Sequence, residues 1–220
     1  MKKGDSLFLV AFLGIEALLY CLVLTTGGTL LRWSSFGSIL LCFLFSFLHC
    51  KQGNRWIISA LALTVMADFF LVAIFPVQRL WGMVCFFCVQ TVYAVMLTRE
   101  RFSRTILTMR IVAICMALLC VVLVLGDKTD PLAIVSIIYY ATLILNILHA
   151  FLIPSMRVFV VALILFLLCD TVVGLQVVSD SYLSVAKDGL LHQLLFSGFN
   201  LAWFFYLPSQ VLISLCSRKK

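Results

Sequence analysis

The sequence predicts an all-α fold class, a polytopic membrane helix bundle with eight transmembrane helices. Of its 220 residues, 64% are apolar and only 11% are charged, whereas an ordinary soluble domain has about 25% charged residues. The mean hydropathy of +1.19 excludes a water-soluble globule, because too few polar residues remain to cover the apolar ones. The apolar runs are continuous rather than alternating, which favours membrane helices over the strands of a membrane barrel.

Eight apolar segments are long enough to cross a bilayer core of about 30 Å, which takes about 20 helical residues. They cover residues 7–26, 33–50, 56–76, 80–98, 105–126, 131–153, 157–178 and 189–216. The connections are short, so we expect a single integral membrane domain, residues 1–220, in which helices that follow each other in sequence are antiparallel neighbours. The first segment is too long for a signal peptide and contains Glu16, so we expect it to be retained.

The distribution of basic residues predicts the orientation of the chain in the membrane. With the N-terminus placed inside, 12 of the 16 lysines and arginines fall on one side of the eight spans. Basic residues in short loops mark the cytoplasmic side, so we expect a multi-pass protein of the cell (inner) membrane with both termini in the cytoplasm. Topology thereby explains the net charge of +7, which gives no support for nucleic-acid binding.

Three acidic residues lie within the apolar segments: Glu16, Asp68 and Asp170. An ionisable side chain in hydrocarbon costs on the order of 3 kcal/mol or more, so these side chains are expected to face the protein interior. At about 1.5 Å per residue the two aspartates lie at nearly the same depth, and the three acids could converge on one polar site. For Glu16 we favour a structural hydrogen bond between helices. For the aspartates, the matched depth favours a general acid paired with a general base.

Other polar side chains fall at compatible depths. Gln90 and Tyr93 share a face of the fourth segment, and Tyr206 and Gln210 are four residues apart in the eighth. These four side chains could bind a substrate headgroup or a water beside the aspartates, or they could be structural hydrogen-bonders between helices. Pro208 should kink the eighth helix and free a backbone carbonyl near Tyr206.

We expect no metal and no cofactor. His49, His149 and His192 lie on three segments, and His192 falls at the opposite membrane face from the other two, so the three imidazoles cannot meet around one ion. Cys85 and Cys88 have the spacing of a redox motif, but their place within an apolar helix favours packing in the core.

The residues around both aspartates resemble those of the YhhN-type lysoplasmalogenase family. Residues 67–71 read ADFFL, similar to the family's Gly/Ala-Asp-x-x-Leu, and residues 166–170 read FLLCD, similar to Phe-x-x-Ser-Asp. Residues 82–93 read GMVCFFCVQTVY, similar to Gly-x-x-x-Phe-x-x-x-His-x-x-Tyr. Residues 206–213 read YLPSQVLI, similar to Tyr-x-x-Ala-Gln-x-Leu-Ile. Eight spans in about this length also fit the family.

Two positions depart from the family pattern, so the chain is identified as a divergent member. Gln90 stands where the family usually has His, and Cys169 stands where it usually has Ser. Glutamine can orient a group but cannot titrate. If the family's His carries a proton, we expect the activity of this chain to be altered or absent.

The resemblance implies hydrolysis of the vinyl ether bond of a lysoplasmalogen, which releases an aldehyde and a glycerophospho alcohol. Such a reaction needs an acid that protonates carbon, an anion near the resulting oxocarbenium ion, and a base for the attacking water. Asp68 and Asp170 suit these catalytic roles. The expected partners are a lysophospholipid substrate from the bilayer and the membrane lipids. The alternatives are a proton-coupled transporter of a small molecule or lipid and a non-catalytic membrane protein on the same fold.

Overall fold

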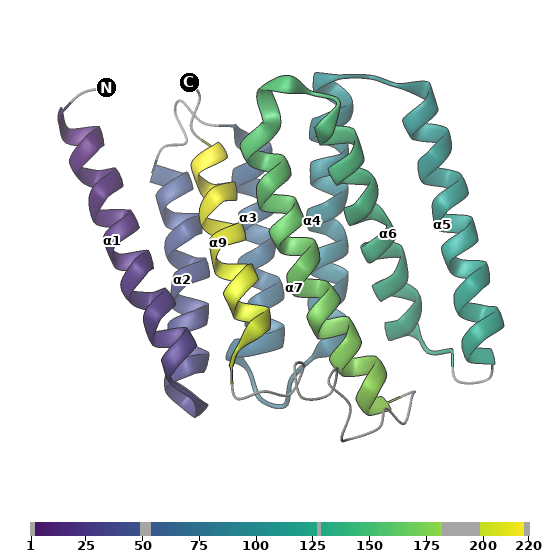
Figure 1. The fold of residues 1–220 in the computed structure, drawn as a ribbon, viewed down its shortest axis with the longest axis horizontal. Coiled ribbons are helices and arrows are strands. Elements are labelled where there is room, and N and C mark those ends of the chain that lie inside the picture. The colour runs from purple at the N-terminus through teal and green to yellow at the C-terminus, as the bar shows by residue number, and fades with distance from the viewer. Residues whose placement is uncertain (1–2, 49–53, 127–128, 182–198, 218–220) are drawn as a thin grey trace.

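The computed structural model describes residues 3–48, 54–126, 129–181 and 199–217, which form a bundle of helices (Figure 1). No strand occurs within these ranges, so the predicted all-α fold class is confirmed. The helices are α1 (Lys3–Thr25), α2 (Gly28–Leu48), α3 (Arg55–Asp68), the π-helical turn η1 (Phe69–Ala73), α4 (Arg79–Glu100), α5 (Arg104–Leu125), α6 (Pro131–Phe151), the short 3₁₀ turn η3 (Pro154–Met156), α7 (Arg157–Ser181) and α9 (Leu201–Cys216).

Side-chain caps fix where several of these helices begin. The side chain of Asn54 accepts a hydrogen bond from the N–H of Trp56 at 3.0 Å at the start of α3. Asp130 does the same for Ala133 at 2.7 Å at the start of α6, where Pro131 occupies the first helical turn. Such caps satisfy backbone donors that the first turn leaves unpaired. Each cap therefore lies at a boundary that the hydropathy pattern also predicts.

Seven of the described spans are long and apolar enough to cross a membrane, with α3 and η1 together forming the span Arg55–Ala73. They indicate a multi-pass membrane protein. The described part of the eighth span, α9, has 16 residues, or about 24 Å of helix, and it begins at Leu201 rather than at the predicted residue 189. Asn200 has a non-helical backbone, and its side-chain N–H donates to the carbonyl of Val23 at 3.0 Å. Residues 182–198 lie outside the described ranges.

The beginning of α1 and the end of α9 lie at the same end of the bundle (Figure 1). This arrangement agrees with the predicted even number of crossings. At the opposite end, α1 passes into α2 through a tight turn in which Gly28 has a φ of 61°, a left-handed conformation that favours glycine. That turn starts α2 five residues before the predicted span.

Five helices form a closed ring around the interior of the bundle. In the order α3, α4, α6, α7 and α9, each helix packs against the next, and α9 packs against α3. The remaining helices lie outside this ring, with α1 at one edge of the bundle and α5 at the other (Figure 1). A side chain that points inward from any of the five helices is therefore enclosed by the other four.

The expectation that helices consecutive in sequence are neighbours is wrong for α4 and α5. Helix α5 packs against α6, which lies between α5 and α4. The connection at residues 101–103 is extended at Arg101 and Ser103, so three residues reach about 10 Å and pass over the end of α6. The Arg101 guanidinium donates to the carbonyl of Leu152, just beyond α6, and fastens the connection there.

Candidate active site

Asp68 is the last residue of α3, where the α-helix gives way to the π-helical turn η1. Its side chain is only 3% exposed. The hydroxyl of Tyr206, on α9, donates a hydrogen bond of 2.6 Å to Asp68 Oδ2. In η1 the N–H of Ile74 bonds to the carbonyl of Phe69 five residues earlier at 3.1 Å, and such π-helical turns are frequent at functional sites.

Asp170 lies on α7 and faces α6. The hydroxyl of Tyr139, on α6, donates a hydrogen bond to Asp170 Oδ2. The residues that follow these two form a second hydrogen bond between α6 and α7, because the hydroxyls of Tyr140 and Thr171 lie 2.8 Å apart. Tyr139 is 2% exposed, whereas Asp170 is partly exposed. The second aspartate is thus held in the same way as the first, by a tyrosine from a neighbouring helix of the ring.

The ring of Phe86, on α4, joins the two tyrosine–aspartate pairs. Its centroid lies 5.9 Å from the ring of Tyr139 and 6.3 Å from the ring of Tyr206. Phe166, one turn before Asp170 on α7, packs against Phe86 at 5.6 Å and against Tyr206 at 5.4 Å. These distances are typical of aromatic pairs in contact. Both tyrosine–aspartate pairs therefore pack on one aromatic cluster inside the ring.

Glu16 does not join this interior, although the three acids were expected to be able to converge. It lies on α1, outside the ring, and is 4% exposed. Its carboxylate accepts hydrogen bonds from Ser38 Oγ at 2.5 Å and from Cys42 Sγ at 3.4 Å, both on α2. The favoured interpretation of Glu16 as a structural contact between helices is confirmed.

Gln90, Tyr93 and Gln210 lie inside the ring but do not hydrogen-bond to either aspartate among the described residues. Asn146, on α6, donates hydrogen bonds of 2.9 Å to the side-chain and backbone oxygens of Gln90. The ring of Tyr93 packs against Phe159 with centroids 5.1 Å apart. Of the four predicted substrate-binding residues, only Tyr206 hydrogen-bonds to an aspartate in the part of the chain that the structure describes.

A second polar network surrounds Asn146 toward the end of the bundle where α9 ends. Arg110, on α5, donates a hydrogen bond of 2.8 Å to Asn146 Oδ1. His149 Nε2 lies 2.8 Å from the carbonyl of Arg101, and its Nδ1 lies 3.5 Å from Arg110. This network ties α5 to α6 and uses His149 structurally. The other two histidines, His49 and His192, lie outside the described residues.

Pro208 frees a carbonyl in α9, as predicted, and a contact with α1 uses it. A proline lacks the N–H that would bond to the residue four positions earlier, which is Phe204. The hydroxyl of Tyr20 donates to the Phe204 carbonyl at 3.2 Å. The carbonyl that Pro208 leaves free therefore accepts a hydrogen bond that holds α1 against α9, and this carbonyl lies two residues before Tyr206.

Cys85 and Cys88 are free thiols on α4. Cys85 packs against the main hydrophobic core, as the packing interpretation predicts. Among the residues that the structure describes, no group of three or more His, Cys, Asp and Glu is placed to hold a metal ion.

Sequence reasoning missed Tyr139 and Phe166, which complete the surroundings of the aspartates. One signal was available for Tyr139, because the pair Tyr139–Tyr140 places hydroxyl groups near the middle of an apolar segment. Phe166 is the first residue of the motif at residues 166–170 that resembles the family pattern, but the motif does not indicate what its ring contacts. Only the packing of α7 against α4 and α9 shows that its ring lies over Tyr206.

No curated protein and no solved structure was found to match the chain. The model of the YhhN family matches residues 29–216. This range runs from the start of α2 to the end of α9 and includes every residue of the aspartate, tyrosine and phenylalanine cluster. The chain therefore belongs to the YhhN family.

Proposed function

We propose that the protein is a membrane-embedded hydrolase that cleaves the vinyl ether bond of a lysophospholipid. The YhhN family is associated with lysoplasmalogenase activity. One observation carries the proposal for this chain. Asp68 and Asp170 lie inside one ring of helices, and each accepts a hydrogen bond from a tyrosine that packs on Phe86.

Two carboxyl groups beside one aromatic cluster suit the chemistry of an enol ether. One carboxyl group donates its proton to the β-carbon of the double bond, which leaves an oxocarbenium ion next to the ether oxygen. The other carboxylate stabilises that cation and takes a proton from the water that attacks it, as in glycoside hydrolysis. The hemiacetal then breaks into an aldehyde and a glycerophospho alcohol. The carboxyl group that took the water proton gives it to the leaving glycerol oxygen, while the other carboxylate takes the proton of the hemiacetal hydroxyl, so both groups return to their starting states. One water is consumed, and the protons gained and lost by the two carboxyl groups balance.

The tyrosines and the aromatic rings prepare the carboxyl groups for this role. A hydrogen bond from a tyrosine hydroxyl fixes the direction of each carboxyl group, and reactions of this kind gain from side chains held in place beforehand. The rings of Phe86 and Phe166 exclude bulk water, which strengthens the interaction between the carboxylate and a developing cation.

The interior also has polar atoms that can hold the water that the reaction consumes. Gln90 Nε2 and both polar side-chain atoms of Gln210 are buried without a hydrogen-bond partner among the described residues. Gln90 lies one helical turn from Phe86, and Gln210 lies one turn from Tyr206. Buried amides without protein partners normally bind ordered water. We therefore assign Gln90 and Gln210 to water or substrate binding.

The test is aldehyde release from an alkenyl lysophospholipid by the purified protein in detergent. We expect wild-type activity, and a loss of at least about 100-fold in Asp68→Asn and in Asp170→Asn, as is typical when an acid or base is removed. The matched control is Glu16→Gln, which changes a buried membrane acid that lies outside the ring. This control variant should keep most of the activity.

Three other results would contradict the proposal. Full activity in both aspartate variants would remove the two-carboxylate mechanism. Equal losses in the Glu16 control would mean that any buried acid is needed for folding. Uptake driven by a pH gradient, with no product formed by the wild type, would instead support a proton-coupled transporter.

A further inference from the structure

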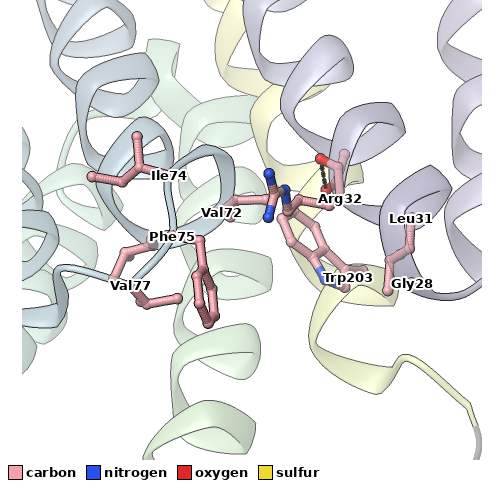
Figure 2. Close-up of a pocket in the computed structure, with 10 residues that line it drawn as sticks. Gly28, Leu31, Arg32, Val72, Ile74, Phe75, Val77 and Trp203 are labelled. Atoms are coloured by element: carbon pink, nitrogen blue, oxygen red, sulfur yellow. Dashed lines mark hydrogen bonds between the residues drawn. The ribbon is translucent and has the colours of Figure 1, made fainter.

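A cavity of about 320 Å³ opens at the end of the bundle where α1 passes into α2. Its walls come from α2, from η1 and the residues that follow it, and from the start of α9 (Figure 2). Most of its lining is apolar, including Val72, Phe75 and Val77. The cavity lies outside the ring of five helices, next to the π-helical turn that follows Asp68.

Arg32 is the only charged residue among the described residues that line this cavity. Figure 2 shows its guanidinium group between Val72 and Trp203. Its Nε atom is buried and has no hydrogen-bond partner among the described residues, and the guanidinium forms no ion pair with a described carboxylate. The group lies 5.4 Å from the ring of Trp33, a contact that does not use its N–H donors. Arg32 as a whole is partly exposed, but a buried N–H such as its Nε normally has a hydrogen-bond partner, and the described residues supply none.

The partner that best fits a guanidinium group in an apolar pocket is an oxyanion. The planar fork of arginine matches two oxygens of a phosphate, and such bidentate pairs are among the strongest hydrogen bonds in proteins. No described residue of the lining is acidic. Among the described residues, the lining therefore carries a cation that can bind a phosphate and no carboxylate that could pair with an amine.

The cavity is adjacent to the carboxyl pair. Trp203 lines it, and the Trp203 ring lies 5.5 Å from the ring of Tyr206, whose hydroxyl bonds to Asp68. On the other wall, Leu71 and Val72 follow Asp68 by three and four residues, or about one helical turn. In a lysophospholipid, the phosphate and the ether oxygen are on the two end carbons of one glycerol.

We propose that Arg32 binds the phosphate of the substrate in this cavity and so directs the vinyl ether toward Tyr206 and Asp68. The choice of a lysophospholipid rests on the proposed function, whereas the assignment of a phosphate rests on Arg32 and the cavity. Because choline and ethanolamine lysophospholipids share the same phosphate, Arg32 itself does not distinguish between them. Neutral single-chain lipids lack the group that Arg32 requires.

The test measures binding by the full chain in detergent and so does not depend on catalysis. The probe is a radiolabelled alkyl lysophospholipid, whose saturated ether cannot be hydrolysed, and the comparison ligand is an alkylglycerol without phosphate. Arg32→Gln should weaken binding of the phosphate-bearing lipid by about 10- to 100-fold and leave alkylglycerol binding unchanged. Arg32→Lys keeps the charge but loses the fork, and should give a smaller loss. Arg79→Gln, which changes an exposed arginine at the same end of the bundle, should alter neither affinity.

The inference is overturned if Arg32→Gln, or Arg32→Lys where the glutamine variant does not fold, retains the wild-type preference for the phosphate-bearing lipid. It is also overturned if inorganic phosphate competes as strongly as the lipid, because the ligand would then be a free phosphate. Hydrolysis assays separate this failure from that of the proposed function. A wild type that binds the phosphate lipid through Arg32 but releases no aldehyde would contradict only the proposed function.

Discussion

Replacing Gly82 with alanine should destabilise the bundle, although alanine is the better helix former. Gly82 lies on α4 against Leu71 of η1, three residues after Asp68. A Cβ atom at position 82 would lie 2.4 Å from Leu71 Cγ and 2.6 Å from Leu71 Cδ2. Ordinary contacts between carbon atoms are about 3.5–4.0 Å. The leucine side chain and the turn that carries it would therefore have to move by about 1 Å.

The sign of the effect distinguishes this contact from helix propensity alone. Inside a helix, a change from glycine to alanine gains about 0.5–1 kcal/mol, whereas overpacking a filled site costs about 1–3 kcal/mol. We expect Gly82→Ala to lower the free energy of unfolding by about 1–2 kcal/mol. Gly37→Ala, on α2, is the matched control, because a Cβ atom there meets nothing within 4 Å. This control variant should be as stable as the wild type or more stable.

The assay is equilibrium unfolding in mixed micelles, with Leu71→Ala used to complete a double-mutant cycle. In the Leu71→Ala background the added methyl group at position 82 has room, so the cost of Gly82→Ala should disappear and the coupling energy should reach about 1–3 kcal/mol. If Gly82→Ala and Gly37→Ala stabilise the protein equally, η1 does not pack against α4 as described. The position of Asp68 at the start of that turn would then need revision.

The other predictions concern hydrogen bonds between helices. Tyr206→Phe removes the hydroxyl that holds Asp68 and should lower the rate of aldehyde release about 10- to 100-fold, with a loss of about 1–3 kcal/mol in unfolding because a buried carboxyl group loses its donor; an unchanged rate would remove Tyr206 from the site. Tyr20→Phe leaves the Phe204 carbonyl without its donor and should cost about 0.5–1.5 kcal/mol in unfolding measurements; a stability equal to that of the wild type would show that α1 is held in other ways. Arg110→Met leaves Asn146 Oδ1 without its hydrogen-bond donor and should lower the free energy of unfolding by about 1–3 kcal/mol. An unchanged free energy of unfolding would show that packing alone holds α5 against α6.

Much of the fold follows from the sequence, because the bilayer fixes both the length and the composition of a span. Seven of the eight predicted spans correspond to described helices that can cross a membrane. The order of the helices around the bundle does not follow from hydropathy. The placement of α6 between α4 and α5 depends on how side chains pack, and the connection at residues 101–103 is long enough to allow either arrangement.

The candidate site was partly predictable for a similar reason. Asp68 and Asp170 stand out because charge is costly in hydrocarbon, and equal depth suggested that they meet. Their tyrosine partners differ in how well the sequence marks them, since Tyr206 lies in a polar stretch of α9 whereas Tyr139 does not. In the sequence, Arg32 is only one of the four basic residues on the less basic side of the predicted membrane topology. Its contact with a cavity depends on the turn at Gly28 and on η1, neither of which hydropathy predicts.

The most direct test of the shared interior is the rate of aldehyde release by Asp68→Asn, Asp170→Asn and the double variant, measured side by side. Residues that act on the same bond as a unit are strongly non-additive. We predict that the double variant is no slower than the slower single variant. Losses that multiply in the double variant would show that the two carboxyl groups act independently, which would contradict a single two-carboxylate site.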